Sequence, residues 1–447
     1  MLDLGVLKVL YNRCDPNRAL EPDDPRNVDI DAADERSARP RGRRWARDLA
    51  TRIRLATEPE LVLFSGLPGS GKTTELRRLA DILGETTGAN LLAVTVDGEA
   101  TLDLSAPLDV PDIMVAIVHA SELAVLQAEG ASAAQAADRA LTNGYLTRFW
   151  HWLQATDVNL GKAEFTLQDV GKLVLELKTR PSFRQRVREL VAANLTSFLA
   201  QARAELSGHE LRARAAGRAG LVVIFDSLEK LRGTSANWDQ VQQSAEQLFA
   251  GGAPYVRLPV HAVYTVPPSL MLRRVEQVQF MPMIKLANRD GSRFAPGWAA
   301  ARDLVLRRVS TENLEQLLGG AWSSRLDRLV ALSGGYPRDL IRLLRELLVC
   351  DEFPVPDDAM EAALAELRDT YHRALTSDAY PWLARVARER RLAVDDERQR
   401  PIADRMLANS VVLRYLNSEE WFDLHPAVRE IPAMLAALQA GERTDDG

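Results

Sequence analysis

The sequence predicts an α/β fold in which a mostly parallel β-sheet is wrapped by helices. Apolar runs at 61–64, 91–96, 221–225 and 259–266 alternate along the chain with segments whose apolar residues recur every three or four positions. Runs without polar alternation are typical of strands that are buried on both faces. Alternation of such strands with helices is the pattern of a parallel sheet covered by helices.

Length and composition place limits on the class of protein. The 447 residues are enough for about two to four domains. With 46% apolar and 26% charged residues and a net charge of −6, the chain has no general attraction for nucleic acid or anionic lipid. The two cysteines suit a reducing compartment. No uninterrupted apolar run approaches the roughly 18 residues of a membrane span and no signal-peptide pattern is found, so we expect a cytoplasmic protein with no membrane association. The cysteines, histidines and carboxylates show no metal-ligand spacing, so we expect no zinc site.

The first predicted strand leads directly into a glycine-rich segment. Residues 66–73, GLPGSGKT, fit the pattern G-x-x-x-x-G-K-[ST], and a helical pattern follows them. Glycines allow backbone N–H groups to turn toward an anion, and the helix presents its positive end there. An ordinary glycine-rich turn is the alternative, but it would not need a strand before it and a helix after it. We expect ATP or GTP to be bound with Mg²⁺ by Gly66, Pro68, Gly69, Ser70, Gly71, Lys72, Thr73 and Thr74.

Within this loop the last residues have separate expected roles. Lys72 is expected to contact the β- and γ-phosphates, and the Thr73 hydroxyl to bind Mg²⁺. A second magnesium ligand is Asp226, a carboxylate at the carboxyl end of the strand at 221–225. The alternative for Asp226 is a helix N-cap. Glu229 is the candidate general base, against the alternative of a solvated residue that pairs with a neighbouring cation.

Polar residues after the fourth strand and in a later helix complete the candidate site. Thr265 ends the fourth apolar run and is expected to reach the γ-phosphate or its attacking water, although an ordinary strand threonine is the alternative. Arg338 opens a helix after Gly-Gly-Tyr-Pro and could approach the phosphates from a lid, or lie on the surface. Arg273 and Arg274 could act on the site of a neighbouring subunit.

The remaining segments differ in character from the sheet. Residues 111–220 have helical patterns and no strand pattern, and we interpret their cluster of Phe149, Trp150 and Trp152 as core packing. Further helices are expected from 296 to 376. Helical patterns at 380–390 and 401–409 are followed by a β-hairpin at 411–424, an order that suggests a winged helix.

Taken together, these motifs resemble the AAA+/STAND group of P-loop ATPases, near origin-licensing ATPases and bacterial signal-transduction ATPases. The resemblance implies that 66–74 is Walker A, 222–226 is Walker B, Thr265 is sensor 1 and Arg338 is sensor 2. Ser227 stands where a second Walker B acidic residue is usual, which implies slow hydrolysis. The implied domains are an N-terminal segment at 1–55, an ATPase core at 56–290 with a helical insertion at about 111–220, a helical lid at 291–376 and a winged-helix domain at 377–440.

The function implied by this resemblance is a switch that binds and hydrolyses ATP and acts on a protein partner, with bacterial stress or defence signalling as its setting. The alternative is a DNA-binding initiator or loader. Residues 401–447 carry more carboxylates than arginines, and Glu419 and Glu420 lie at the tip of the predicted hairpin, which favours a protein partner over DNA. A structural ATP binder without turnover is a third possibility, and a homo-oligomer is compatible with the arginines at 273 and 274.

Overall fold

The computed structural model describes residues 2–156, 173–234, 236–251, 253–273, 275, 278–392 and 394–445. The chain divides into two compact units. The first comprises Met1–Trp45, Gly66–Glu75 and Met281–Gly447, and the second comprises Ala46–Ser65 and Leu76–Phe280. We describe each unit by itself.

The sheet of the second unit confirms the predicted fold class. It has five strands in the order β2-β3-β4-β1-β5, and the pairs β2–β3, β3–β4 and β1–β4 are parallel. Every residue of β3 is buried, which explains why its sequence lacks polar alternation. The strands are β1 (Leu61–Gly66), β2 (Leu91–Asp97), β3 (Gly220–Asp226), β4 (His261–Thr265) and β5 (Val278–Met281).

Register brings the ends of these strands to one edge of the sheet. Phe64 lies opposite Thr265, and Asp97 lies opposite Asp226. The Ser65 hydroxyl donates a hydrogen bond of 2.9 Å to the carbonyl of the residue that follows β4. In a parallel sheet this carboxyl edge is where ligands bind, so the topology places the candidate residues of β3 and β4 at a chemically suitable edge.

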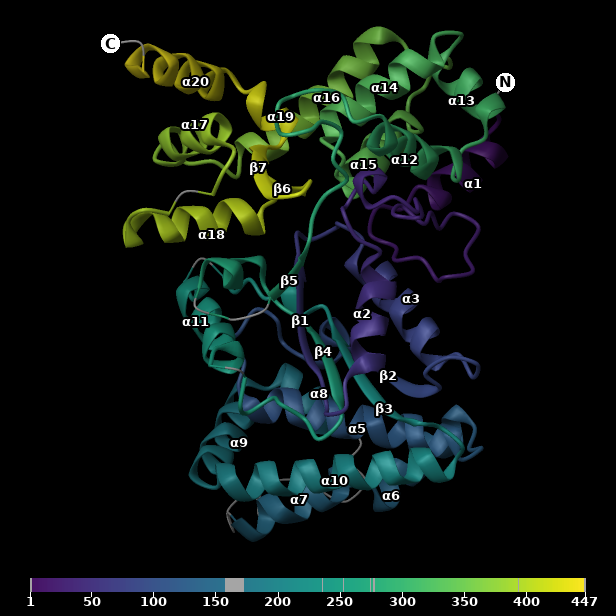
Figure 1. Ribbon diagram of the computed structural model, residues 1–447, viewed down its shortest axis with the longest axis vertical. Coiled ribbons are helices and arrows are strands. Elements are labelled where there is room, and N and C mark those ends of the chain that lie inside the picture. Colours follow the sequence, from purple (N-terminus) through teal and green to yellow (C-terminus); the bar gives the residue numbers. More distant parts are fainter. Residues whose placement is uncertain are drawn as a thin grey trace. The chain divides into compact units, whose positions relative to one another are not determined.

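Helices α5 to α10 form a helical block, as predicted, and α5 and α10 of this block pack against β2 and β3 (Figure 1). Residues 157–172 of the predicted block lie outside the described residues. The long helices α5 and α10 pack against each other, α5 against β2 and α10 against β3. By length and composition α5 could cross a membrane, but 72% of its 18-residue window is buried inside the structure, as in a core helix. Their bounds are α5 Val110–Ala128, α6 Ala133–Asn143, α7 Tyr145–Thr156, α8 Leu173–Thr179, α9 Pro181–Ala193 and α10 Leu195–Ala215.

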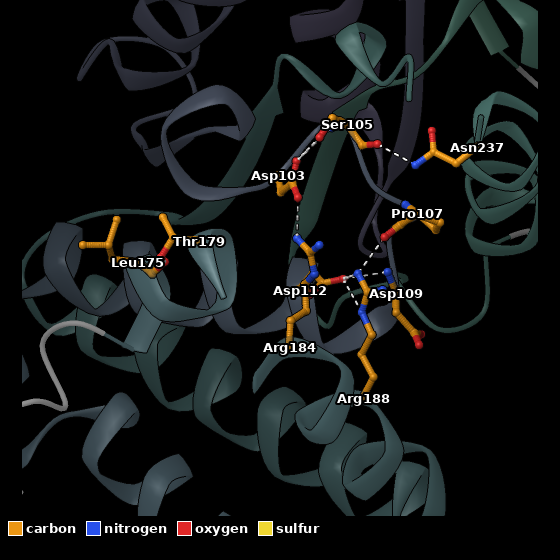
Figure 2. Close-up of polar contacts among 10 residues, drawn as sticks. All are labelled: Asp103, Ser105, Pro107, Asp109, Asp112, Leu175, Thr179, Arg184, Arg188 and Asn237. Atoms are coloured by element: carbon orange, nitrogen blue, oxygen red, sulfur yellow. Dashed lines mark hydrogen bonds and ion pairs between the residues drawn. The ribbon is translucent and has the colours of Figure 1, made fainter. Parts of the chain in front are cut away.

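Two arginines of α9 attach that helix to the loop that leads into α5 (Figure 2). Arg184 Nη1 lies 3.0 Å from Asp103 Oδ2, and Arg188 pairs with Asp112 and donates to the Pro107 carbonyl. Asp112 also completes a capping box at the start of α5. Burial raises the pKa of Asp112 while the Arg188 charge opposes that rise. These pairs therefore fix the start of α5 and the position of α9 together.

The aromatic residues of α7 lie in the core, as predicted. Phe149 and Trp150 are almost fully buried. The Phe149 ring stacks on that of Trp152 at a centroid distance of 5.9 Å and packs against Phe198 of α10. Burial of these large side chains provides a substantial hydrophobic contribution to the stability of the helical block.

The other elements of the second unit are short helices around the sheet. Helix α11 lies between the third and fourth strands, in agreement with the predicted alternation of strands and helices. These elements are α2 Trp45–Leu55, α3 Lys72–Gly84, α4 Gly98–Thr101, η4 Leu228–Lys230, α11 Trp238–Phe249 and η5 Pro268–Leu272, where α3 begins in the first unit.

The described residues of the first unit form helices and one antiparallel hairpin, together with irregular segments and an isolated bridge between Ala287 and Arg293. The hairpin of β6 (Val412–Leu416) and β7 (Glu420–Leu424) follows two helices, which is the order of elements that the sequence predicts. The helices are α1 Leu4–Arg13, η1 Arg36–Ala38, α12 Ala295–Leu306, α13 Thr311–Leu318, α14 Trp322–Ser333, α15 Pro337–Leu347, α16 Asp357–His372, α17 Ala379–Glu389, η6 Glu397–Gln399, α18 Arg400–Ala408, α19 Pro426–Arg429 and α20 Pro432–Asp445.

Candidate nucleotide-binding site

The phosphate loop lies in the first unit and has the backbone that its glycines allow. Gly69 and Gly71 have φ values of +84° and +96°, a left-handed region that favours glycine. A Cβ at Gly66 would lie 3.0 Å from the Met281 carbonyl oxygen. The loop runs directly into α3, which begins at Lys72. The N-terminal end of α3 therefore adjoins the loop, and both can contribute backbone N–H groups to a bound anion.

Side chains of the loop are suited to an anion. Lys72 is 2% exposed, and its Nζ lies 3.0 Å from both the Gly66 and Leu67 carbonyl oxygens. Ser70 is 1% exposed, and its Oγ has no hydrogen-bond partner among the residues that the structure describes. A buried hydroxyl without a partner is costly unless a ligand binds it. The loop therefore fits the triphosphate of a nucleotide.

Arg338 lies against the phosphate loop within the first unit. A Cβ at Gly69 would be 2.6 Å from Arg338 Nε and 2.8 Å from its Cβ. Nε of Arg338 has no hydrogen-bond partner among the described residues. The helix α15 begins at Pro337, which explains how the sequence turns this arginine toward the loop. Arg338 is half-buried beside Gly69, and its role toward a bound phosphate stays a prediction.

The tyrosine two residues earlier contacts the loop directly, and sequence reasoning did not assign it. The Tyr336 hydroxyl donates a hydrogen bond to the Pro68 carbonyl. On its other side the Tyr336 ring meets the edge of His425, at a centroid distance of 6.1 Å. The sequence signal that could have identified Tyr336 is its position beside the predicted helix start at Gly-Gly-Tyr-Pro.

His425 belongs to a buried polar cluster beneath this turn. Its ring stacks on Tyr371 at 4.3 Å, and its Nε2 lies 3.3 Å from Asp339 Oδ2. The Tyr371 hydroxyl donates to the same carboxylate oxygen at 2.7 Å. Burial raises the pKa of Asp339, but its hydrogen bonds and the nearby His425 hold it below the ordinary value. Helices α15, α16 and α19 are thus joined beside Arg338.

The same turn also contacts the C-terminal hairpin. The Tyr415 hydroxyl of β6 donates a hydrogen bond of 2.6 Å to the Gly334 carbonyl. A Cβ at Gly334 would lie 2.6 Å from Pro426 Cδ, and one at Gly335 would lie 1.8 Å from the Ile284 carbonyl oxygen. Both glycines have positive φ, a backbone conformation that residues with a side chain rarely adopt. Substitution of either glycine in the turn 334–338 would therefore be unfavourable.

A buried ionic cluster attaches the N-terminal segment to the helix of the phosphate loop. Arg41 is 2% exposed and pairs at 2.8 Å with both Asp31 and Glu75. Although burial lowers the pKa of Arg41, the two carboxylates raise it above its ordinary value. The Leu20 N–H also donates to the Thr74 hydroxyl at 3.4 Å. Nothing in the sequence distinguishes Arg41 from its neighbouring surface arginines.

The second unit carries the predicted acidic residues at the carboxyl edge of its sheet. Asp226 is 5% exposed, and its Oδ1 accepts a hydrogen bond of 2.7 Å from the Ser227 N–H. Ser227 has a φ of +71°, which is unusual for a residue with a side chain. Thr265 is fully buried and its hydroxyl accepts from the Leu228 N–H at 2.9 Å, so it holds the loop after β3.

Glu229 and Arg273 are also placed by the second unit. Glu229 lies in η4 and is 4% exposed, which excludes the alternative of a solvated residue. Arg273 pairs with Glu246 of α11 at 2.8 Å and is largely covered. The predicted role of Arg274 lies outside the described residues.

No family model and no curated protein matches the chain. The Aeropyrum pernix ORC2 protein, solved in ADPNP-ADP complexes, is 13% identical over 94% of this chain and 98% of its own, with a TM-score of 0.35. The ORC1 protein of that organism, solved in complex with DNA, is 15% identical over 95% and 96%, with a TM-score of 0.33.

Similarity at this level does not assign a function to the chain. Its own loop and sheet define the class of fold, which is that of a P-loop NTPase.

Proposed function

We propose that this protein is an ATP-binding switch of the AAA+ type that hydrolyses ATP slowly and transmits its nucleotide state to a protein partner. The observation that carries the proposal is the turn 334–338. It contacts the phosphate loop through Tyr336 and Arg338, and the C-terminal hairpin through Gly334 and Tyr415. Phosphates that enter the loop would compete for the space beside Gly69 and so act on this turn.

Each candidate residue would have a separate role in binding or hydrolysis. The N–H groups of 66–74 and Lys72 would hold the phosphates, and Arg338 would contact the γ-phosphate from the lid. Thr73 and Asp226 would hold Mg²⁺, which supplies charge neutralisation on the phosphate oxygens. Glu229 would orient and deprotonate the attacking water. Thr265 would keep the loop after β3, and so Asp226, in place.

Hydrolysis is proposed to be slow because Ser227 replaces a second carboxylate. Its left-handed backbone and the hydrogen bond from its N–H to Asp226 give it a structural role in the loop. We also propose that Arg273 and Arg274 act on the nucleotide site of a neighbouring subunit in a homo-oligomer. For Arg273 the ion pair with Glu246 would first have to open. We retain the boundaries 1–55, 56–290, 291–376 and 377–440 as proposed functional regions.

A protein partner is favoured over DNA by the charges around the C-terminal segment. Arg385 pairs with Glu389 and Asp395, and Arg391 also pairs with Glu389. These arginines therefore carry counter-charges that phosphates would have to displace. A DNA complex at physiological salt that is lost in the double variant Arg388→Glu/Arg391→Glu would instead support the initiator or loader function.

The experiment that tests the switch measures bound nucleotide and turnover together. Lys72→Ala should lose ATP binding, whereas Glu229→Gln should retain ATP and stop turnover. Lys8→Ala and Glu58→Gln change exposed residues of the same types and serve as matched controls. Retained ATP binding in Lys72→Ala would refute the phosphate site, and unchanged turnover in Glu229→Gln would remove that residue from the catalytic role.

A further inference from the structure

Two segments that follow neighbouring strands connect the helical block with the candidate catalytic residues. Residues 98–109 follow β2 and comprise α4 and the loop that leads into α5; we call them the linking segment. Residues 226–234 begin at the last residue of β3 and hold Asp226 and Glu229; we call them the Asp226 loop. Both segments belong to the second unit, as do helices α8 and α9, so the contacts among them lie within one compact unit.

On one side the linking segment lies directly against the main chain of the Asp226 loop. A Cβ at Gly98 would be 3.0 Å from the Asp226 carbonyl oxygen and 3.4 Å from a ring carbon of Phe225. Gly98 is buried and is the first residue of α4, where alanine would favour the helix more than glycine does. Because its φ is not in the left-handed region, the close approach to Asp226 is what favours glycine there. The position of the Asp226 main chain therefore depends on the linking segment.

Two polar contacts extend this junction along both segments. The Lys230 ammonium group pairs with the Glu99 carboxylate. Asn237, just beyond the Asp226 loop, joins the segments a second time. Its amide nitrogen donates a hydrogen bond of 2.9 Å to the Ser105 carbonyl (Figure 2), and its amide oxygen accepts one from the Thr234 N–H. The Asp226 loop is thus attached to the linking segment near both of its ends.

On its other side the linking segment is held by cationic side chains of α8 and α9. The Lys178 ammonium group donates a hydrogen bond to the Glu99 carbonyl. Arg184 is 7% exposed and pairs with Asp103 at 3.0 Å, and Arg188 donates to a main-chain carbonyl of the segment at 2.6 Å (Figure 2). Glu99 consequently binds the Asp226 loop through its side chain and α8 through its main chain.

The Asp226 loop has a backbone that its surroundings must maintain. Ser227 has a φ of +71°, a region that residues with a side chain rarely adopt. Such a conformation persists only where neighbouring contacts determine it, and it is typical of functional sites. The Thr265 hydroxyl supplies one such contact by accepting from the Leu228 N–H at 2.9 Å. The linking segment supplies the others described above, at Asp226 and on both sides of Glu229.

We propose that the helical block holds Asp226 and Glu229 in place for hydrolysis through the linking segment. Lys178, Arg184 and Arg188 are then positioning residues, which act on the reaction without contacting the nucleotide. The proposal rests on the proposed roles of Asp226 and Glu229. A displacement of about 1 Å, even when caused far from the reacting atoms, can lower a rate about 100-fold. Loosening the linking segment should therefore lower turnover, while the phosphate loop still binds ATP.

Hydrogen–deuterium exchange of the nucleotide-free protein tests the coupling without ATP or Mg²⁺. The double variant Arg184→Gln/Asp103→Asn removes both charges of the largely buried pair, so neither is left without its partner. Amides at 226–234 should then exchange about tenfold faster than in the wild type. Arg148→Gln/Glu205→Gln is the matched control, since it removes a pair that joins α7 to α10, and exchange at 226–234 should stay unchanged.

Turnover of the same variants tests whether this positioning serves hydrolysis. Arg184→Gln/Asp103→Asn and Gly98→Ala should each lower kcat about tenfold or more, with the KM for ATP changed by less than about threefold. Glu99→Lys should also lower kcat, and the exchanged pair Glu99→Lys/Lys230→Glu should restore it. This pair is partly exposed and contributes little to stability, so rescue reports positioning of the loop.

Three results would overturn the proposal: unchanged exchange at 226–234 in Arg184→Gln/Asp103→Asn, wild-type kcat in Gly98→Ala, or an equal fall of kcat in the control. Thermal melting and ATP binding are measured for every variant, so a variant that keeps both and loses turnover has lost positioning and not the fold. Absence of turnover in the wild type would refute the proposed hydrolysis. Faster exchange at 226–234 would in that case still show that the helical block holds the loop.

Discussion

The substitution Arg41→Met should destabilise the first unit strongly. It removes the cation that two buried carboxylates share, since the side chains of Asp31 and Glu75 are 2% and 6% exposed. Removing one partner of a buried ion pair costs about 3–5 kcal/mol because the opposite charge stays buried. A loss of about 4 kcal/mol corresponds to a fall in melting temperature of about 8–16 °C for a unit of this size.

The pH dependence gives this prediction a second, independent readout. Burial already holds the pKa of Asp31 above its ordinary value, and the charge of Arg41 opposes that rise. Without Arg41 the folded-state pKa rises further above the unfolded value of about 3.9, so the folded state takes up a proton more readily. The variant should therefore regain stability relative to the wild type as the pH falls from 7 toward 5.

Near-UV circular dichroism during urea and thermal unfolding, at pH 7 and pH 5, measures both effects. Arg36→Met removes an exposed arginine from the same segment and serves as the control, with an expected change within about 0.5 kcal/mol. A loss below about 1 kcal/mol for Arg41→Met, or a loss that does not shrink at lower pH, would refute this account of the buried cluster.

Three further predictions follow from single residues. Gly69→Ala should weaken ATP binding by about tenfold, because a left-handed alanine costs about 1–2 kcal/mol and its Cβ would collide with Arg338; unchanged affinity for a fluorescent ATP analogue would contradict this. Tyr336→Phe should lower stability by about 1 kcal/mol, since the Pro68 carbonyl loses its donor, and a urea midpoint equal to that of the wild type would disprove it. His209 has a folded-state pKa of about 4 against an ordinary 6.5, so the unfolded state binds more protons between those pH values and wild-type stability falls as the pH is lowered through them. His209→Gln should remove about 2–3 kcal/mol of that fall between pH 7 and pH 4.5, as measured by urea unfolding.

The sheet was predictable because its central strands are continuously apolar. Residues 221–225 are all buried in β3, and the helix that follows the phosphate loop begins at Lys72, where the motif places it. The strand β5 was missed because its four residues include a glutamine and give too short a run. Apolar patterns in the sequence indicate which residues are buried, and for β3 the residues that they indicate are buried in the structure.

The contacts that organise the candidate site were beyond local patterns. Tyr336 and Pro68 are 268 positions apart in the chain, and no periodicity connects them. Arg41 lies among other arginines that are more exposed, so nothing in its neighbourhood predicts that it would be buried between two carboxylates. Thr265 was placed correctly at the end of β4. Its hydrogen bond to the Leu228 N–H depends on the left-handed Ser227, which sequence propensity disfavours.

The short turn 334–338 links the affinity of the protein for nucleotide to the affinity of its C-terminal hairpin for a partner. The turn contacts both parts, because the Gly334 carbonyl accepts a hydrogen bond from the hairpin and the Tyr336 hydroxyl donates one to the phosphate loop. If nucleotide binding changes the affinity of the hairpin for a partner by some factor, that partner must change nucleotide affinity by the same factor. A partner could thus retain or expel ATP without ever touching it, and substitutions of Tyr415 should alter a dissociation constant measured with nucleotide alone.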